Sequence, residues 1–589
     1  MTPRRTITLP LALTLVLAPL ACSGDDPLDD ENAGFPDGKS DGGIDEGSPE
    51  ALAVLALVND TSVDTDELDD DAGLNATAAK NIIAHRDGAD AAAATTDDNP
   101  YDTLAELDAV SFVGPIALAA LLEYAKEKGL LGGDEGNVSV IFSPQPAEAS
   151  HNARIAQLID QAEHTVDIAM YSFSDAGISA ALERAVDRGV KVRFVFETAN
   201  EDKSLTGSAL ASSKSGRLEA AGVNVRFVNK IMHHKLAIID GPRDDVERAA
   251  TSTLVTGSGN WSFSGGSQFD ENTLFFTGQA ELAMKYQREF DLMWNHSRDL
   301  VAVPSLAFEV STADLSNIPD TPGLDVLFTS NNFDISEGST TFRTDKSSLA
   351  VASQWVAAIQ GARTSIHIAS GHLRLKPVAE ALIAAKQANP DLDIKVYLDQ
   401  QEFISQSGDD FQKGEVQDCL AGADTDSERF DCENKEFLWS RSVLLSGIDV
   451  RFKSYAFRWD HSYAVQMHDK YMVIDGQRLF SGSYNLSMNS EHDTFENCVV
   501  MDGAEFADII SAYEANFAAI WETGRADDLL SDLRETISTA STIPIVFDSM
   551  ALTWQEFTDL RSLIMENCTQ VNSDEFRRNA AAHKVCPRL

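Results

Sequence analysis

Hydrophobic and polar positions follow the same succession twice along the chain. From residue 138, apolar runs typical of strands (SVIFSP, TVDIAMYSF, VKVRFVFE, VNVRFVN) alternate with segments of helical period such as ARIAQLIDQA and ISAALERAVDRG. The succession returns after residue 324, from DVLFTS and VASQWVAAIQGA through TSIHIAS and DIKVYLDQ to VLLSGIDVRFKS. Strands that alternate with helices predict an α/β fold, and the repetition predicts two related halves.

The segments outside this repeat differ in pattern and composition. A polar insertion at about 402–437 interrupts the second copy, and apolar helical patterns with acidic breaks precede the first copy. An acidic stretch rich in Gly and Pro cannot bury a core and is predicted to be disordered. The predicted parts are a signal segment, an acidic linker, a helical segment, the first half, a linker, the second half and a helical tail: 1–22, 23–50, 51–132, 138–300, 301–324, 325–525 and 526–589.

The N-terminus has the pattern of an export signal. Arg4 and Arg5 precede an apolar run from Ile7 to Leu20, and a polar stretch follows Cys22. The run is short for a membrane span, and Cys22 after a small residue resembles the lipidated cysteine of bacterial lipoproteins. Two locations stay open: a cell-envelope lipoprotein held at Cys22, or a secreted protein after ordinary signal cleavage.

The remaining cysteines fit an exported protein. Cys419 with Cys432, and Cys568 with Cys586, are close pairs in polar segments and are candidate disulfides. Cys498 lies in the apolar run ENCVVM, where we expect a buried thiol.

The formal net charge of −47 opposes a general nucleic-acid-binding surface, because Lys and Arg drive binding to phosphate backbones. Two pieces of 51–132, AGLNATAAKNIIAHR and FVGPIALAALLEYA, partly resemble helix-hairpin-helix units that grip such backbones. Asn75 and Phe112 stand where those units carry glycine, and acidic residues crowd the first hairpin. The charge favours a packing or spacer module over DNA binding.

The repeats carry matching chemical motifs. IMHHKLAIIDG in the first copy and QMHDKYMVIDG in the second both read His-x-Lys-x-x-x-x-Asp. On a strand, residues two apart point to the same face, so each His and Lys project together. The motif residues are His233, Lys235 and Asp240 in the first copy, and His468, Lys470 and Asp475 in the second.

Each motif is followed by a Gly-Ser-x-Asn turn and then by a Glu-Asn pair that opens a strand. A ten-residue insertion around PRDDVERAAT in the first copy explains the differences in spacing between the copies. The additional candidates are Ser258, Asn260 and Glu271 in the first copy, and Ser483, Asn485 and Glu496 in the second.

These residues resemble the paired HKD motifs of the phospholipase D superfamily, over about 138–525. The resemblance implies two α/β sandwich halves that form a pseudo-dimer with one active site, preceded by the helix-hairpin-helix-like segment. It also implies phosphodiester cleavage through a phosphohistidine, without cofactor or metal, since the lysines supply the positive charge.

By the same resemblance, His233 is assigned as nucleophile and His468 as general acid and base, although the residues alone cannot order them. The glutamates would each fix one histidine tautomer, and the aspartates would be structural. His234 is expected to face outward, and His367 and His372 to be packing or rim residues. The groups expected to hold the phosphate oxygens, with the serines assisting, are Lys235, Lys470, Asn260, Asn485, Ser258 and Ser483.

The expected substrate is a phospholipid, because export and a lipid anchor would place the chain beside a membrane. A nuclease is the first alternative, which the charge balance opposes. A non-catalytic surface binding protein is the second. We expect a monomer with an internal pseudo-twofold axis.

Overall fold

The computed structural model describes residues 44, 49–61, 63–88, 95, 99–101, 103–128, 138–300, 306–435 and 437–587. The predicted signal segment, Cys22 and most of the acidic linker lie outside these residues. Contacts divide the chain into two units, 1–131 and 132–589, which are described separately.

The smaller unit is helical, as its apolar patterns predict. Its α-helices are α1 (Pro49–Asn59), α2 (Ala76–Arg86), α3 (Leu104–Asp108) and α4 (Pro115–Glu127). Asn75, at a position where helix-hairpin-helix units carry glycine, caps α2 by accepting the backbone N–H of Thr77 and Ala78. The guanidinium of Arg86 is buried and donates to the backbone oxygens of Asp60 and Val63 at 2.6 and 2.9 Å. This cation therefore links α2 to the backbone that follows α1.

The larger unit contains two eight-stranded sheets with the same topology. In the first sheet the order is β1-β8-β7-β6-β2-β3-β4-β9, with β2, β3 and β4 parallel to one another and the other neighbours antiparallel. Its strands are β1 (Val138–Ser143), β2 (Thr165–Met170), β3 (Lys191–Phe196), β4 (Asn224–Phe227), β6 (Lys235–Ile239), β7 (Thr253–Gly257), β8 (Glu271–Thr277) and β9 (Arg298–Asp299).

The second sheet repeats this order as β10-β19-β17-β16-β13-β14-β15-β21, with the same strand directions. Its strands are β10 (Leu324–Phe328), β13 (Ser365–Ser370), β14 (Asp393–Asp399), β15 (Asp449–Ala456), β16 (Lys470–Ile474), β17 (Arg478–Gly482), β19 (Asn497–Asp502) and β21 (Val546–Thr553). The predicted α/β fold with two repeated halves is confirmed.

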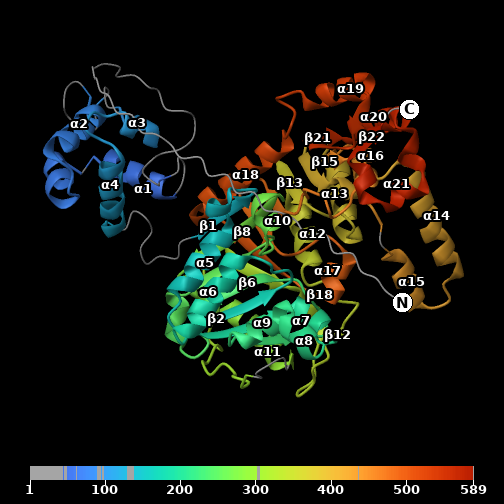
Figure 1. Ribbon diagram of the computed structural model, residues 1–589, viewed down its shortest axis with the longest axis horizontal. Coiled ribbons are helices and arrows are strands. Elements are labelled where there is room, and N and C mark those ends of the chain that lie inside the picture. Colours follow the sequence, from blue (N-terminus) through green and yellow to red (C-terminus); the bar gives the residue numbers. More distant parts are fainter. Residues whose placement is uncertain are drawn as a thin grey trace, which may run out of the picture. The chain divides into compact units, whose positions relative to one another are not determined.

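Helices cover both faces of each sheet (Figure 1). The outer faces pack against α5 (His151–Gln161) and α6 (Ala176–Asp187) in the first half, and α12 (Ala352–Gly361) and α13 (Lys376–Ala388) in the second. The inner faces share one apolar core with α11 (Ala280–Asn295) and α18 (Ala507–Trp521). Both faces of the central strands are therefore buried, which explains their continuous apolar runs.

The shorter elements connect these layers. The remaining helices of the larger unit up to residue 500 are α7 (Glu197–Asp202), α8 (Gly207–Ser212), α9 (Lys214–Ala220), α10 (Phe263–Ser267), α14 (Gln406–Gly422), α15 (Asp426–Glu433), α16 (Ser440–Leu445) and α17 (Met488–Asp493). The short strands are β5 (Ile231–Met232), β11 (Phe333–Asp334), β12 (Arg343–Thr344) and β18 (Thr494–Phe495). Within the predicted insertion, a disulfide joins Cys419 of α14 to Cys432 of α15.

The C-terminal segment corrects the prediction of a helical tail at 526–589. It contains α19 (Leu529–Thr539), α20 (Trp554–Asn567) and α21 (Asp574–Arg578), but also β20 (Thr542–Pro544), β21 and β22 (Val585–Pro587). β21 pairs with β15 and so covers the edge of the second sheet. The predicted disulfide between Cys568 and Cys586 is present, and Cys498 is a buried thiol.

Among the described residues, no helix has both the length and the apolar character needed to cross a bilayer.

Candidate active site

Short strand pairings between the halves bring the two motifs together. β5 pairs in parallel with β18 of the other half, and the His233 N–H donates to the Phe495 backbone oxygen at 3.2 Å. At the equivalent place Asp270 bridges Met467, and the His468 N–H donates to the Asp270 backbone oxygen at 2.9 Å. Each histidine therefore stands beside the glutamate strand of the opposite half.

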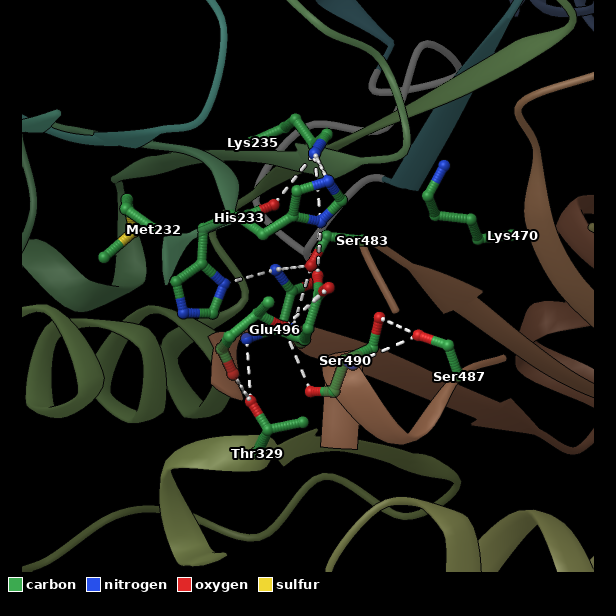
Figure 2. A network of polar contacts seen from close by, with 12 residues as sticks. Met232, His233, Lys235, Thr329, Lys470, Ser483, Ser487, Ser490 and Glu496 are labelled. Carbon is green, nitrogen blue, oxygen red and sulfur yellow. Dashed lines mark hydrogen bonds and ion pairs between the residues drawn. The ribbon is translucent and has the colours of Figure 1, made fainter. Parts of the chain in front are cut away.

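The histidine–glutamate pairs cross between the halves. His233 Nδ1 lies 2.9 Å from Glu496 Oε2, and His468 Nδ1 lies 2.9 Å from Glu271 Oε1. Figure 2 shows the His233–Glu496 contact with Lys235 beside the ring. Both glutamates are fully buried. Since each carboxylate engages Nδ1, the Nε2 atom of each ring is left for chemistry with a substrate.

Burial and neighbouring charge set the protonation of these pairs. Burial, with the charges of Lys235 and Lys470, holds the pKa of His233 well below its usual value. Burial also lowers the pKa of His468 to about 4. Neutral rings with an unprotonated nitrogen are therefore favoured in the empty site, as a nucleophile or a base requires.

The two glutamates differ in electrostatic environment. Burial raises the pKa of Glu496 to about 7. Burial would also raise the pKa of Glu271, but its interaction and hydrogen bond with His468 and the charge of Lys470 outweigh that effect and hold this pKa below its usual value. The pseudo-symmetric site is thus electrostatically unequal.

Both motif lysines lie buried beside their histidines. Lys235 Nζ donates to the His233 backbone oxygen at 2.9 Å and lies 3.2 Å from His233 Nε2. Lys470 Nζ donates to the His468 backbone oxygen at 2.6 Å. Burial lowers the pKa of Lys235 to about 7 and also lowers that of Lys470. A bound phosphate would favour the charged form of both lysines.

The turns after the motifs bring two asparagines to the same region. Asn260 and Asn485 are half-buried, and the side-chain oxygens of both are buried without a protein partner within the described structure. Asn485 lines the cavity beside His233. These amides are therefore available as ligands for a polar group.

The two serines support the glutamate strands. Ser258 and Ser483 are fully buried, and their hydroxyl oxygens accept the backbone N–H of Asn272 and Asn497 at 2.9 and 3.0 Å. The glycines that precede them are required by close packing, because a Cβ at either would lie 2.3 Å from the backbone oxygen of the same asparagine. The predicted assistance to phosphate binding is not visible in these contacts.

The motif aspartates lie at strand ends and bind backbone amides. Asp240 accepts hydrogen bonds at 2.7–3.0 Å from the N–H groups of residues 163–165, and Asp475 accepts them at 2.7–3.1 Å from those of residues 363–365. Both residues have φ near +50°. This geometry is that of structural caps.

The residues between each His and Lys point into the interface between the halves. The prediction that His234 faces outward is wrong: it is fully buried, and its Nδ1 lies 2.8 Å from Asn497 Nδ2. In the other motif, Asn272 Nδ2 donates to Asp469 Oδ1 at 2.7 Å. The asparagine after each glutamate thus locks the opposite motif in place.

Sequence reasoning did not identify the aromatic neighbour of His233. The ring of Tyr171 lies 4.7 Å from the ring of His233. Tyr171 follows β2 and donates its backbone N–H to the His234 oxygen, while Gly371 follows β13 and makes the same contact with Asp469. Aligning the two repeats beyond their strands would have revealed this difference.

A cavity of about 620 Å³ opens beside His233 and Tyr171. His372, which was expected to pack or lie at a rim, lines it together with Arg374. His367 is not among the residues that line this cavity. Its Nδ1 lies 2.6 Å from Glu514 Oε2, and its ring stacks on Phe517. Within the described part of the chain, no group of three or more His, Cys, Asp or Glu side chains could hold a metal ion.

Comparisons with known proteins agree with this architecture. The family model described as cardiolipin synthase, PLD-like domain, matches residues 155–294 and 355–521, one match in each half. The mitochondrial cardiolipin hydrolase of Xenopus tropicalis is 29% identical over 153 residues, which cover 26% of this chain and 64% of the frog protein. The chain therefore spans less than two thirds of that relative. A phospholipase D of Rickettsia conorii is 31% identical over 173 residues, covering 29% of this chain and 75% of the relative.

Among solved structures, the phospholipase D family member NUC of Salmonella typhimurium is 28% identical and covers 28% of this chain and 98% of its own, with a TM-score of 0.23. Phosphatidylserine synthase of Haemophilus influenzae is 11% identical and covers 74% of this chain and 94% of its own, with a TM-score of 0.41. Both scores are low, so the assignment rests on the family model. Its matches span more than half of the chain, which belongs to the phospholipase D superfamily through two PLD-like domains.

Proposed function

We propose that the chain is a phospholipase D-type phosphodiesterase that hydrolyses phospholipids, and transfers their phosphatidyl group to alcohols, through a phosphohistidine. The observation that carries the proposal is the pair of crossed His–Glu contacts at 2.9 Å, each beside a buried lysine. The arrangement provides a nucleophile, an acid and positive charge around a phosphate.

In the first step, His233 Nε2 attacks phosphorus and a new P–N bond forms. A bound phosphate diester favours the protonated form of His468, as it favours the charged lysines. The bond from phosphorus to the head-group oxygen breaks, and that oxygen takes the proton from His468 Nε2. Charge on the non-bridging oxygens is balanced by Lys235 and Lys470. Glu496 stabilises the positive charge that develops on the His233 ring.

In the second step, His468 Nε2 takes a proton from water, and the water oxygen attacks phosphorus. The P–N bond breaks, which returns His233 to its neutral form and releases the phosphatidic acid. A primary alcohol can replace water in this step, and the product is then a transphosphatidylated lipid. His468 acts as acid in one step and as base in the other.

Phospholipid is the proposed substrate class. The names of the similar proteins, cardiolipin hydrolase and phospholipase D, support a lipid phosphodiester. The predicted export signal supports a location beside a membrane, and the net charge of −47 opposes long polyanions.

Incubation with phospholipid vesicles and a primary alcohol tests the proposal. We expect free head group and transphosphatidylated lipid, and we expect His233→Ala and His468→Ala each to lower turnover by about 10³-fold or more. His461→Ala is a matched control, because that side chain is 85% exposed. EDTA should leave the rate unchanged.

Three outcomes would contradict the proposal. Normal turnover in both histidine variants would exclude the mechanism, and loss of activity with EDTA would exclude charge stabilisation by lysine alone. Degradation of plasmid DNA with intact lipid would identify a nuclease. Consumption of neither substrate, with lipid binding retained, would identify a binding protein.

A further inference from the structure

The cavity beside His233 is built mainly by the second half. The first half supplies Tyr171, Ile231 and His233, while the other lining residues follow position 340. α15 of the insertion supplies one stretch of wall, together with the residue that ends it: Phe430, Asp431 and Asn434. The insertion interrupts one copy of the repeat, so the cavity is not a feature that the pseudo-twofold axis duplicates.

A buried carboxylate fixes two nitrogen-bearing side chains in this wall. Glu402 is fully buried, and its Oε1 lies 3.1 Å from His372 Nδ1 and 2.8 Å from Arg374 Nε. Its other oxygen accepts the backbone N–H of Leu373 at 3.0 Å. Because Glu402 holds both side chains in place, His372 and Arg374 form a pre-organised group of donors at the cavity surface.

The insertion is fastened to the body of the second half at the cavity. The disulfide between Cys419 and Cys432 ties α15 to α14. Lys346, which precedes α12, lies 2.7 Å from Asp431 of α15, and both side chains are more than half exposed. These contacts therefore fix the position of α15 as one wall of the cavity.

The aromatic rings of the lining already have cations beside them. Lys346 Nζ lies 5.7 Å from the ring centre of Phe430, and Lys235 Nζ lies 5.3 Å from that of Tyr171. A quaternary ammonium group binds through open aromatic faces, and here a lysine already lies over each of the two rings. Hydroxyl groups instead match the mixed polar wall, which supplies amides, hydroxyls, cations and carboxylates, among them Asn434, Asn485, Ser487, Arg374, Asp431 and Asp493.

We propose that the α14–α15 insertion, with Glu402 and its partners, forms a head-group subsite that takes hydroxyl-bearing head groups and excludes quaternary ammonium. The proposal rests on the phospholipase activity proposed above. It assigns selectivity to residues outside the repeated motifs, namely Lys346, His372, Arg374 and Phe430.

Kinetics on three substrates test this subsite: phosphatidylglycerol and phosphatidylcholine, each diluted in neutral detergent micelles, and soluble bis(4-nitrophenyl) phosphate. We expect the unaltered protein to prefer phosphatidylglycerol over phosphatidylcholine by about tenfold or more in kcat/KM. Arg374→Gln and Lys346→Gln should each lower kcat/KM for phosphatidylglycerol by about tenfold. Both variants should cleave the soluble diester at a rate within about twofold of the unaltered protein.

Lys395→Gln is the matched control, because Lys395 lies on β14 and pairs with Asp393. It should change none of the three rates. Cys419→Ser combined with Cys432→Ser should also reduce the preference for phosphatidylglycerol. Unfolding curves check that this double variant is folded.

Two results would overturn the subsite. One is equal use of both lipids, or a preference for phosphatidylcholine, by the unaltered protein. The other is an equal loss on all three substrates in the Arg374 and Lys346 variants. Cleavage of the soluble diester without cleavage of either lipid would instead contradict the proposed phospholipase function, so the two failures are distinguishable.

Discussion

At the scale of single residues, equivalent positions in the two motifs have different environments. The residue between His and Lys is His234 in one half and Asp469 in the other, and both are buried. Burial raises the pKa of Asp469 to about 8. The protein therefore holds an uncharged carboxyl group at neutral pH in the support of its own active site.

Asp469 makes stability depend on pH with a definite sign. Its unfolded carboxyl ionises near pH 4 and its folded carboxyl near pH 8, so the folded state binds more protons between these values and is destabilised as pH rises. We expect Asp469→Asn to stabilise the fold by several kcal/mol at pH 8, because each unit of pKa difference is worth about 1.4 kcal/mol, and by much less at pH 4. The amide introduced by this substitution would keep an oxygen for the hydrogen bond from Asn272. Denaturant unfolding at both pH values measures the effect.

Asp475→Asn is the opposite control, because hydrogen bonds to backbone amides hold the pKa of Asp475 below its usual value despite partial burial. It should destabilise at pH 8. If Asp469→Asn were equally destabilising at both pH values, the uncharged state of Asp469 would be excluded.

Because the motif aspartates cap strand ends, we expect their substitution to lower the stability of the fold and to leave the reaction rate nearly unchanged. Asp240→Ala removes acceptors for three backbone N–H groups and places alanine at a φ of 49°. We expect a loss of about 2–3 kcal/mol of unfolding free energy, and a smaller loss for Asp240→Asn. The kcat of the folded fraction should stay within about twofold of normal. A large fall in kcat for a fully folded variant would assign Asp240 to the reaction itself.

At the scale of elements, sheet edges and helix faces explain the segments around the repeat. β21 covers the edge of the second sheet, and the tail packs its own apolar cluster against Phe457. In the smaller unit, the Arg86 guanidinium donates hydrogen bonds to backbone oxygens of the same unit. This supports a packing role for the helix-hairpin-helix-like segment over phosphate binding.

Two truncations test the role of the C-terminal tail and the role of the smaller unit separately. Removal of residues 526–589 should give insoluble protein, because it exposes the edge of β15 and uncovers Phe403 and Phe457, against which the apolar cluster of the tail packs. Removal of residues 1–131 should leave soluble and active protein, because the core clusters of both halves draw on later residues. Soluble yield and circular dichroism measure both. A soluble, active variant without 526–589 would show that β21 is dispensable.

At the scale of the whole molecule, the candidate active site exists only where the halves meet. Each histidine takes its glutamate from the other half, and one apolar core joins both inner sheet faces. The duplicated motifs are thus two parts of one site.

Separate expression of the two halves tests whether both are needed to form the site. Fragments 132–305 and 306–589 should each be inactive alone, and their co-expression should restore activity, because the shared core drives reassociation. A first fragment with Glu271→Gln should fail to restore activity, since Glu271 serves His468. Activity in either single fragment would contradict the crossed pairs.

The predicted lipid anchor belongs to the same scale. If the protein is anchored at Cys22 as predicted, Cys22→Ala should move it from the membrane fraction to the soluble fraction, because the acyl chains would be lost. Fractionation of cells with immunoblotting measures this shift. An unchanged distribution would favour ordinary signal cleavage.

Much of the fold could be predicted from the sequence by itself. The order of strands and helices, the two motifs and the candidate disulfide pairs follow from apolar period and residue spacing, which are local properties of the chain. The paired motifs also carry the resemblance to the family. β21 was missed because its run, VFDSMALT, has a weak strand pattern and gains its stability from the edge of β15.

Only the tertiary structure decided how the halves meet. The crossing of His233 to Glu496 depends on the pairing of β5 with β18, and the crossing of His468 to Glu271 depends on the bridge between Asp270 and Met467. Both contacts join residues that lie far apart in the chain. The burial of His234, the uncharged state of Asp469 and the cavity wall formed by α15 arise in the same way. Long-range packing sets the local dielectric and the neighbours of each group, and spacing along the chain carries no information on either.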